Sequence, residues 1–148
     1  MKPLRLLPSL FFLVLFSCKE VAPAPGVGDQ LKGGAWLTLS QSYRYYDASG
    51  QLVHEEVDSS GTLFDFDGYR VTISYGTGTT TQCLYTLLES NGRSYIELTR
   101  DGLLQTYEIT SIGDSVMSWS TEAEEAECPD SGSKTAGHAT TTTRFSRQ

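Results

Sequence analysis

The sequence predicts an all-β fold, an antiparallel up-and-down β-barrel of about eight to nine strands. Three observations predict it. After residue 35, apolar and polar residues alternate with a period of two in several segments, turn-forming residues recur every eight to twelve positions, and no segment shows the apolar period of a helix. At 148 residues, the chain is long enough for one domain with a packed core.

The first seventeen residues have the features of a signal peptide. Lys2 and Arg5 supply a positive start, and an apolar run from Leu6 to Phe16 follows. A membrane-spanning helix needs roughly 20 apolar residues, so this run is too short to stay in place as a span. Residues 1–17 are therefore expected to be an export leader that is removed.

A cysteine directly follows this leader. The stretch Leu15-Phe16-Ser17-Cys18 resembles the lipobox of bacterial lipoproteins. The resemblance implies that lipid is attached to the Cys18 thiol and that its acyl chains anchor the protein to a membrane. In such lipoproteins an Asp after the cysteine often signals inner-membrane retention, so Lys19 implies the outer membrane instead. Whether the protein faces the periplasm or the cell surface stays open.

A spacer separates this anchor from the domain. Residues 19–30 contain two Pro and two Gly and show no apolar period, which is the composition of a flexible tether. The expected organisation is a signal peptide over 1–17, a lipidated cysteine with its tether over 18–30, and a β-barrel domain over 31–148.

Nine strands are expected in the domain. The clearest is Tyr69–Tyr75, in which apolar residues occupy odd positions and polar residues even ones. Asn91-Gly92 and Asp101-Gly102 indicate tight hairpins, since these dipeptides tolerate the positive φ that such turns require. The expected ranges are 35–46, 51–57, 62–67, 69–75, 80–89, 93–99, 103–110, 115–121 and 138–146.

The strands follow one another as a meander, with a long acidic loop over 122–137 before the last strand. An open sheet of this size would leave two unpaired edges, and pairing of the first strand with the last removes both. A closed barrel is therefore favoured over a sandwich.

The layout of the domain resembles that of small bacterial lipocalin-like lipoproteins. The shared features are a Gly-x-Trp sequence at Gly34–Trp36, a stretch from Tyr107 to Ser115, and Trp119. The resemblance covers residues 31–148. It implies a lipocalin-like barrel in which Trp36 packs against a late arginine, Arg144, where the first and last strands meet.

The first strand leaves its inner face undecided. Leu37, Leu39, Tyr43 and Tyr45 share one face of a regular strand, and Trp36 lies on the other. The alternation by itself does not decide which of these faces points into the barrel.

Three cysteines leave an odd one in an exported protein. Lipid on Cys18 would account for one of them, which leaves Cys83 and Cys128 as a pair in an oxidising compartment. We expect a disulfide between them. Two unpaired thiols are the alternative.

The sequence offers little support for an enzyme. His54 and His138 lie far apart, and the chain has no nucleophile elbow, phosphate loop or metal-ligand spacing. A formal net charge of −7 argues against nucleic-acid binding, which needs a basic face. We expect no catalytic residue, no metal, no cofactor and no nucleic-acid partner.

Aromatic residues are the remaining candidates for a binding site. They could line a barrel pocket for a small apolar or aromatic ligand, or they could simply fill the core. With a filled core, the alternative function is a surface interaction protein that docks a protein partner or inhibits an enzyme. The candidate ligand-binding residues are Tyr43, Tyr45, Phe64, Phe66, Tyr69, Tyr75, Tyr85, Tyr107 and Trp119.

Overall fold

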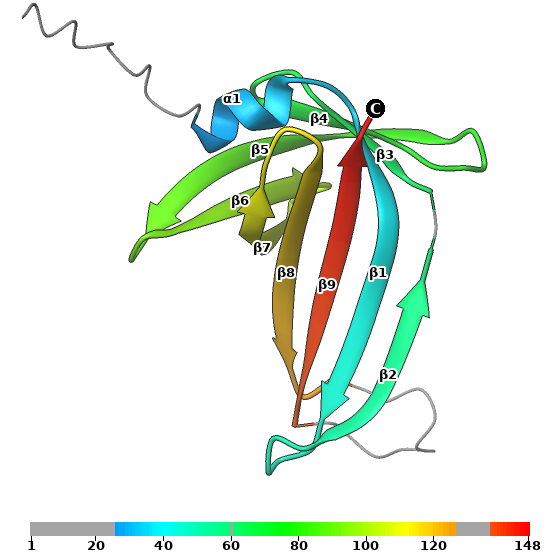
Figure 1. The fold of residues 1–148 in the computed structure, drawn as a ribbon, viewed down its shortest axis with the longest axis vertical. Helices are drawn as coiled ribbons and strands as arrows, with labels where there is room; N and C mark the ends of the chain where they lie inside the picture. The colour runs from blue at the N-terminus through cyan, green and yellow to red at the C-terminus, as the bar shows by residue number, and fades with distance from the viewer. Residues whose placement is uncertain (1–25, 60, 127–136) are drawn as a thin grey trace, which may run out of the picture.

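The computed structural model describes residues 26–59, 61–126 and 137–148 (Figure 1). Within these ranges the chain forms an antiparallel β-barrel of eight strands plus one extra strand, with one short helix. The elements are α1 (Val27–Lys32), β1 (Trp36–Tyr46), β2 (Leu52–Asp58), β3 (Leu63–Phe66), β4 (Arg70–Ser74), β5 (Thr80–Ser90), β6 (Arg93–Arg100), β7 (Leu103–Ile112), β8 (Val116–Glu124) and β9 (His138–Arg147).

Pairing of the first and last strands closes the barrel, as predicted. β1 and β9 run antiparallel from Trp36 opposite Arg147 to Tyr46 opposite His138. The other barrel strands pair in the order β3-β4-β5-β6-β7-β8-β9, and β3 returns to β1. These pairings join the eight strands into a closed ring, with β1 and β3 paired at Trp36 and Leu37.

The expected simple meander is wrong at β2, which is the extra strand. β2 pairs with β1 over Gln41–Tyr46, whereas Trp36 and Leu37 pair on the same edge of β1 with β3. β1 is long enough for two partners, so β3 occupies the ring position that β2 would have taken. Figure 1 shows β2 beside β1 at the end of the molecule away from α1.

The predicted strand boundaries agree closely with the structure, except at the ends of β7 and β8. β7 continues to Ile112 and β8 to Glu124. Glu122 and Glu124, which were expected in the acidic loop, pair with Thr140 and His138 of β9. Strand pairing therefore extends into the polar sequence, where period-two alternation of apolar residues has ended.

Helix α1 covers one end of the barrel and corrects the expected tether. Residues 27–30 were predicted to be a flexible spacer, but they belong to α1. Six residues are too few to show the apolar period of a helix in the sequence. The Leu31 side chain at the end of α1 is fully buried, so tertiary packing stabilises the helix. Within residues 26–59, 61–126 and 137–148, the chain has no helix that could span a lipid bilayer.

A β-bulge in β1 explains which face of the first strand points into the barrel. The register with β9 shifts between Thr38 and Ser40, so Leu39 is the extra residue and is half exposed. Trp36 and Thr38 are buried before the bulge, and Gln41 faces the barrel interior after it. Each of the two predicted faces therefore points inward along a different part of the strand.

The contact between Trp36 and the last strand involves Arg147, so the prediction of Arg144 is wrong. The Arg147 guanidinium carbon lies 4.6 Å from the centroid of the Trp36 ring. Arg147 also donates a hydrogen bond to the Gln30 carbonyl, and the Trp36 indole N–H donates to the Leu31 carbonyl at 3.0 Å. Arg144 is exposed because it alternates with Thr143 and Phe145, which are both buried.

Cys83 lies on β5 and faces the core. The structure contains it as a free, buried cysteine, and so gives no support to the predicted disulfide with Cys128. Cys128 and Cys18 both lie outside the described residues.

Candidate binding pocket

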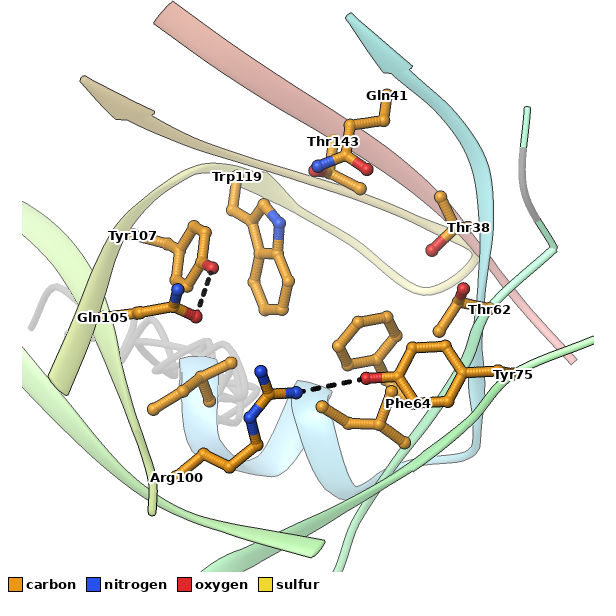
Figure 2. Close-up of a pocket in the computed structure, with 12 residues that line it drawn as sticks. Thr38, Gln41, Thr62, Phe64, Tyr75, Arg100, Gln105, Tyr107, Trp119 and Thr143 are labelled. Carbon is orange, nitrogen blue, oxygen red and sulfur yellow. Dashed lines mark hydrogen bonds between the residues drawn. The ribbon is translucent and has the colours of Figure 1, made fainter. Parts of the chain in front are cut away.

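A cavity of about 190 Å³ opens at the end of the barrel away from α1 (Figure 2). Seven of the eight barrel strands contribute to its wall, together with Thr62 between β2 and β3 and Tyr75 directly after β4. The lining residues are Thr38, Gln41, Thr62, Phe64, Ile73, Tyr75, Leu98, Arg100, Gln105, Tyr107, Trp119 and Thr143.

Trp119 is the centre of the aromatic wall. Tyr107 stacks on it, with ring centroids 4.9 Å apart and an interplanar angle of 22°, and Phe64 meets it edge-on at 5.4 Å. Phe145 supports the indole from the core side at 4.6 Å. These packed neighbours hold the Trp119 ring in one orientation at the cavity wall.

A row of polar side chains runs across the same wall. Trp119 lies opposite Thr143 in the β8–β9 register, and Thr143 lies opposite Gln41 in the β9–β1 register. The Trp119 Nε1 atom is buried, and no residue in the described part of the chain accepts its hydrogen bond. In Figure 2 this nitrogen lies on the edge of the ring toward Gln41 and Thr143. A buried donor without a partner is energetically costly, and an acceptor brought into the cavity would relieve that cost.

Arg100 and Tyr75 form part of the mouth. They lie at the ends of the β4–β5 and β6–β7 hairpins, and the Arg100 Nη1 donates to the Tyr75 hydroxyl at 3.4 Å. The Arg100 side chain is 51% exposed, so it contacts solvent and also lines the cavity. Nearby, the Tyr107 hydroxyl donates to Gln105 Oε1 at 3.1 Å.

The electrostatics of the cavity combine burial with one positive charge. Burial raises the pKa of the Tyr107 hydroxyl, and the Arg100 charge opposes that rise. Among the described residues that line the cavity, Arg100 carries the charge and no carboxylate, histidine or cysteine is present. In the part of the chain that the structure describes, no group of three or more potential metal ligands occurs.

Four of the nine predicted aromatic residues line the cavity: Phe64, Tyr75, Tyr107 and Trp119. Phe66 and Tyr85 are buried in the core, where their rings meet edge-on at 5.2 Å. The prediction for these two is corrected to core packing.

The other three predicted aromatic residues lie outside the cavity. Tyr43 and Tyr45 follow the bulge toward the end of β1, where Tyr45 packs against His54 of β2 at 5.6 Å. Tyr69 is 57% exposed next to the β3–β4 turn and lies under the Arg70 guanidinium. Tyr69 lies just before β4, where side chains no longer alternate between the two faces of the sheet. The period-two pattern therefore did not predict the direction of its side chain.

Sequence reasoning missed the polar half of the wall. The signal was present in two strands, since Arg100 shares a face with buried Leu98, and Gln105 shares a face with Tyr107. The sequence around Gln41 did not indicate that this residue faces the cavity, because the bulge at Leu39 places it on the opposite face from the one that regular alternation with Trp36 predicts.

No protein-family model matches the sequence, and a search of curated proteins finds no match. Among solved structures, the chain is similar to a lipocalin-like protein from Bacteroides uniformis. The two are 14% identical with a TM-score of 0.43, and the similarity covers 80% of this chain and 99% of the other.

Proposed function

We propose that this protein is an envelope-anchored lipoprotein whose barrel binds one small apolar or aromatic molecule without transforming it. The observation that carries the proposal is the cavity at the open end of the barrel, with the Trp119 ring as a preformed wall. A concave site that combines an aromatic wall with placed polar groups is typical of small-molecule binding.

The size of the cavity supports a ligand of one ring with a short substituent. An apolar cavity of roughly 150 Å³ holds a benzene molecule, whereas pockets for drug-sized ligands occupy roughly 300–1,000 Å³. At about 190 Å³, this cavity is closer to the first case. Small ligands gain at most about 1.5 kcal/mol per heavy atom, so we expect modest affinity.

Titration of the ¹⁵N-labelled full chain tests the proposal. The chain contains two tryptophans, and their indole N–H signals report on different places. Trp119 lines the cavity, whereas the Trp36 N–H is bonded to the Leu31 carbonyl beneath α1. Benzyl alcohol or indole should shift the Trp119 signal with saturation and leave the Trp36 signal unchanged. A sterol-like compound should be too large to do so.

Two matched variants locate the binding site. Ile73→Phe adds bulk to the cavity wall and should weaken binding of indole, whereas Leu104→Phe adds the same ring on β7 at an exposed position. If none of these compounds shifts the Trp119 signal, or if both variants bind indole like the parent chain, the pocket proposal is wrong.

The anchor is proposed from the lipobox resemblance. Replacement of Cys18 by Ala removes the thiol that would carry the lipid, so the protein should move from the membrane fraction to the soluble periplasmic fraction. A Cys18→Ala variant that stays with the membrane after a carbonate wash would contradict this part of the proposal.

Protein docking is the second candidate function. Leu84 of β5 and Leu104 of β7 flank Thr99 of β6 in register, and both leucines are more than half exposed. Exposed apolar side chains that lie together are a common feature of interaction surfaces. Failure of every small molecule to bind would favour this candidate.

A further inference from the structure

We propose that the molecule bound in this pocket is a small aromatic anion, a single ring bearing a carboxylate that Arg100 holds at the mouth. This inference rests on the proposed function and adds the charge and chemical class of the ligand. The argument starts from a contrast between the pocket and the rest of the chain.

The chain is acidic, but the described lining of its cavity is not. The formal net charge is −7, with 18 acidic and 11 basic side chains. The described residues that line the cavity nevertheless include Arg100 and no acid. An anion in the cavity would therefore meet a cation and no carboxylate among the described lining residues, although the protein as a whole repels it.

The donors of Arg100 are only partly used by the protein. Its Nη1 bonds the Tyr75 hydroxyl at 3.4 Å, and its Nε lies 4.0 Å from the Asp101 carboxylate. A guanidinium carries five N–H donors in a planar fork that matches a carboxylate, so donors remain for a ligand. The Asp101 side chain is 90% exposed, and such surface pairs contribute little.

The charge of Arg100 acts on the interior of the pocket as well as on solvent. Burial raises the pKa of the Tyr107 hydroxyl and of the Cys83 thiol, and the Arg100 charge opposes the rise in both. Both groups lie inside the barrel, so the field of the guanidinium extends beyond the mouth.

The aromatic side chains and the charged side chain lie in different parts of the cavity. In Figure 2 the guanidinium lies on the opposite side of the cavity from Thr143 and Gln41, with Tyr107 and Trp119 along the wall between. A ring held against this aromatic wall can therefore direct a one-carbon-linked carboxylate toward Arg100.

Phenylacetate and phenylacetamide test this assignment, because they have the same ring and link and differ in charge. Both are titrated into the ¹⁵N-labelled full chain, and the Trp119 indole signal, identified by its loss in Trp119→Phe, reports binding. We expect phenylacetate to bind about tenfold more tightly, since hydrogen bonds to charged groups are stronger than neutral ones.

Two substitutions on β6 provide the matched comparison. Arg100→Gln should abolish the preference for phenylacetate over phenylacetamide. Arg93→Gln makes the same change at an exposed arginine that pairs with Glu108 away from the cavity, so it should leave the preference intact.

The outcomes separate this inference from the proposed function. Equal binding of the two compounds, or a preference that survives in Arg100→Gln, would overturn the assignment of an anionic ligand while leaving a small-molecule pocket in place. If neither these compounds nor benzyl alcohol or indole shifts the Trp119 signal, the proposed function and the inference both fail.

Discussion

At the residue scale, the side on which a strand residue points decides what it can do. Arg144 and Arg147 are three positions apart on β9, so they face opposite sides of the barrel wall. Only Arg147 reaches the Trp36 ring, and its side chain fills the space beside Gly33 so closely that a Cβ at residue 33 would overlap Arg147 Nη1. Gly33 leaves room for the arginine.

Replacement of the two arginines by alanine should give unequal losses of stability. Arg147→Ala removes the contact with the Trp36 ring and the hydrogen bond to the Gln30 carbonyl, which should lower the free energy of unfolding by roughly 2 kcal/mol. Arg144→Ala, at an exposed position, should change it by less than about 0.5 kcal/mol. Urea denaturation measures both. Equal losses would mean that Arg147 is not the residue that stabilises this end of the barrel.

Asp101 offers a second residue-scale test, because its carboxylate competes with a bound anion for Arg100. It occupies a left-handed turn position, φ 52°, that Asn also tolerates, so Asp101→Asn removes the charge and keeps the turn. Phenylacetate should bind roughly twofold to fivefold more tightly to this variant, the range expected for loss of an exposed ion pair. Phenylacetamide binding should not change. A uniform change for both compounds would point to an altered pocket shape instead.

At the scale of the element, the bulge in β1 allows one strand to serve two parts of the barrel. Before Leu39, β1 buries Trp36 and Thr38 at the end covered by α1, and after it the strand directs Gln41 into the cavity. A regular strand could not bury both sets, since successive side chains alternate in side.

Deletion of Leu39 should therefore be far more damaging than its substitution. Deletion reverses the side of every residue on one part of the strand and forces either Trp36 or Gln41 outward, so we expect loss of the cooperative unfolding transition. Leu39→Ala keeps the bulge at a half-exposed position and should cost less than about 1 kcal/mol. A deletion variant with parent-like stability and an unchanged Trp119 signal would show that the bulge is dispensable.

At the scale of the whole molecule, the barrel combines a closed, packed end with an open end that holds the cavity. The first contains α1, Trp36 and Arg147, and the second contains the hairpins that present Tyr75 and Arg100. Because the two ends are built by different residues, we expect substitutions at the mouth to alter binding with little effect on folding. Acid stability, in contrast, depends on turns placed around the whole barrel.

The carboxylate of Asp67 illustrates this dependence on pH. It accepts hydrogen bonds from the backbone N–H groups of Arg70 and Tyr69, which lower its pKa below the ordinary value. A lowered pKa contributes stability above the unfolded value of about 3.9, and this contribution is lost as the pH falls through the folded value. Asp67→Asn keeps an acceptor that does not titrate, so its stability should fall less than that of the parent chain between about pH 5 and pH 2. Parallel curves from urea denaturation would contradict this.

The sequence by itself determined the local features of the fold. Nine strands, their turns and the pairing of the first strand with the last follow from period-two alternation and from Gly-containing turns, which depend on neighbours in the chain. The same patterns singled out Phe64, Tyr75, Tyr107 and Trp119.

Tertiary structure decided the remaining features. The six-residue α1, the bulge at Leu39, the displacement of β2 and the choice of Arg147 over Arg144 each depend on which distant segment packs against which. The positive mouth of the pocket belongs to this second group, because Arg100 meets Tyr75 only after the barrel has curved and brought two hairpins together.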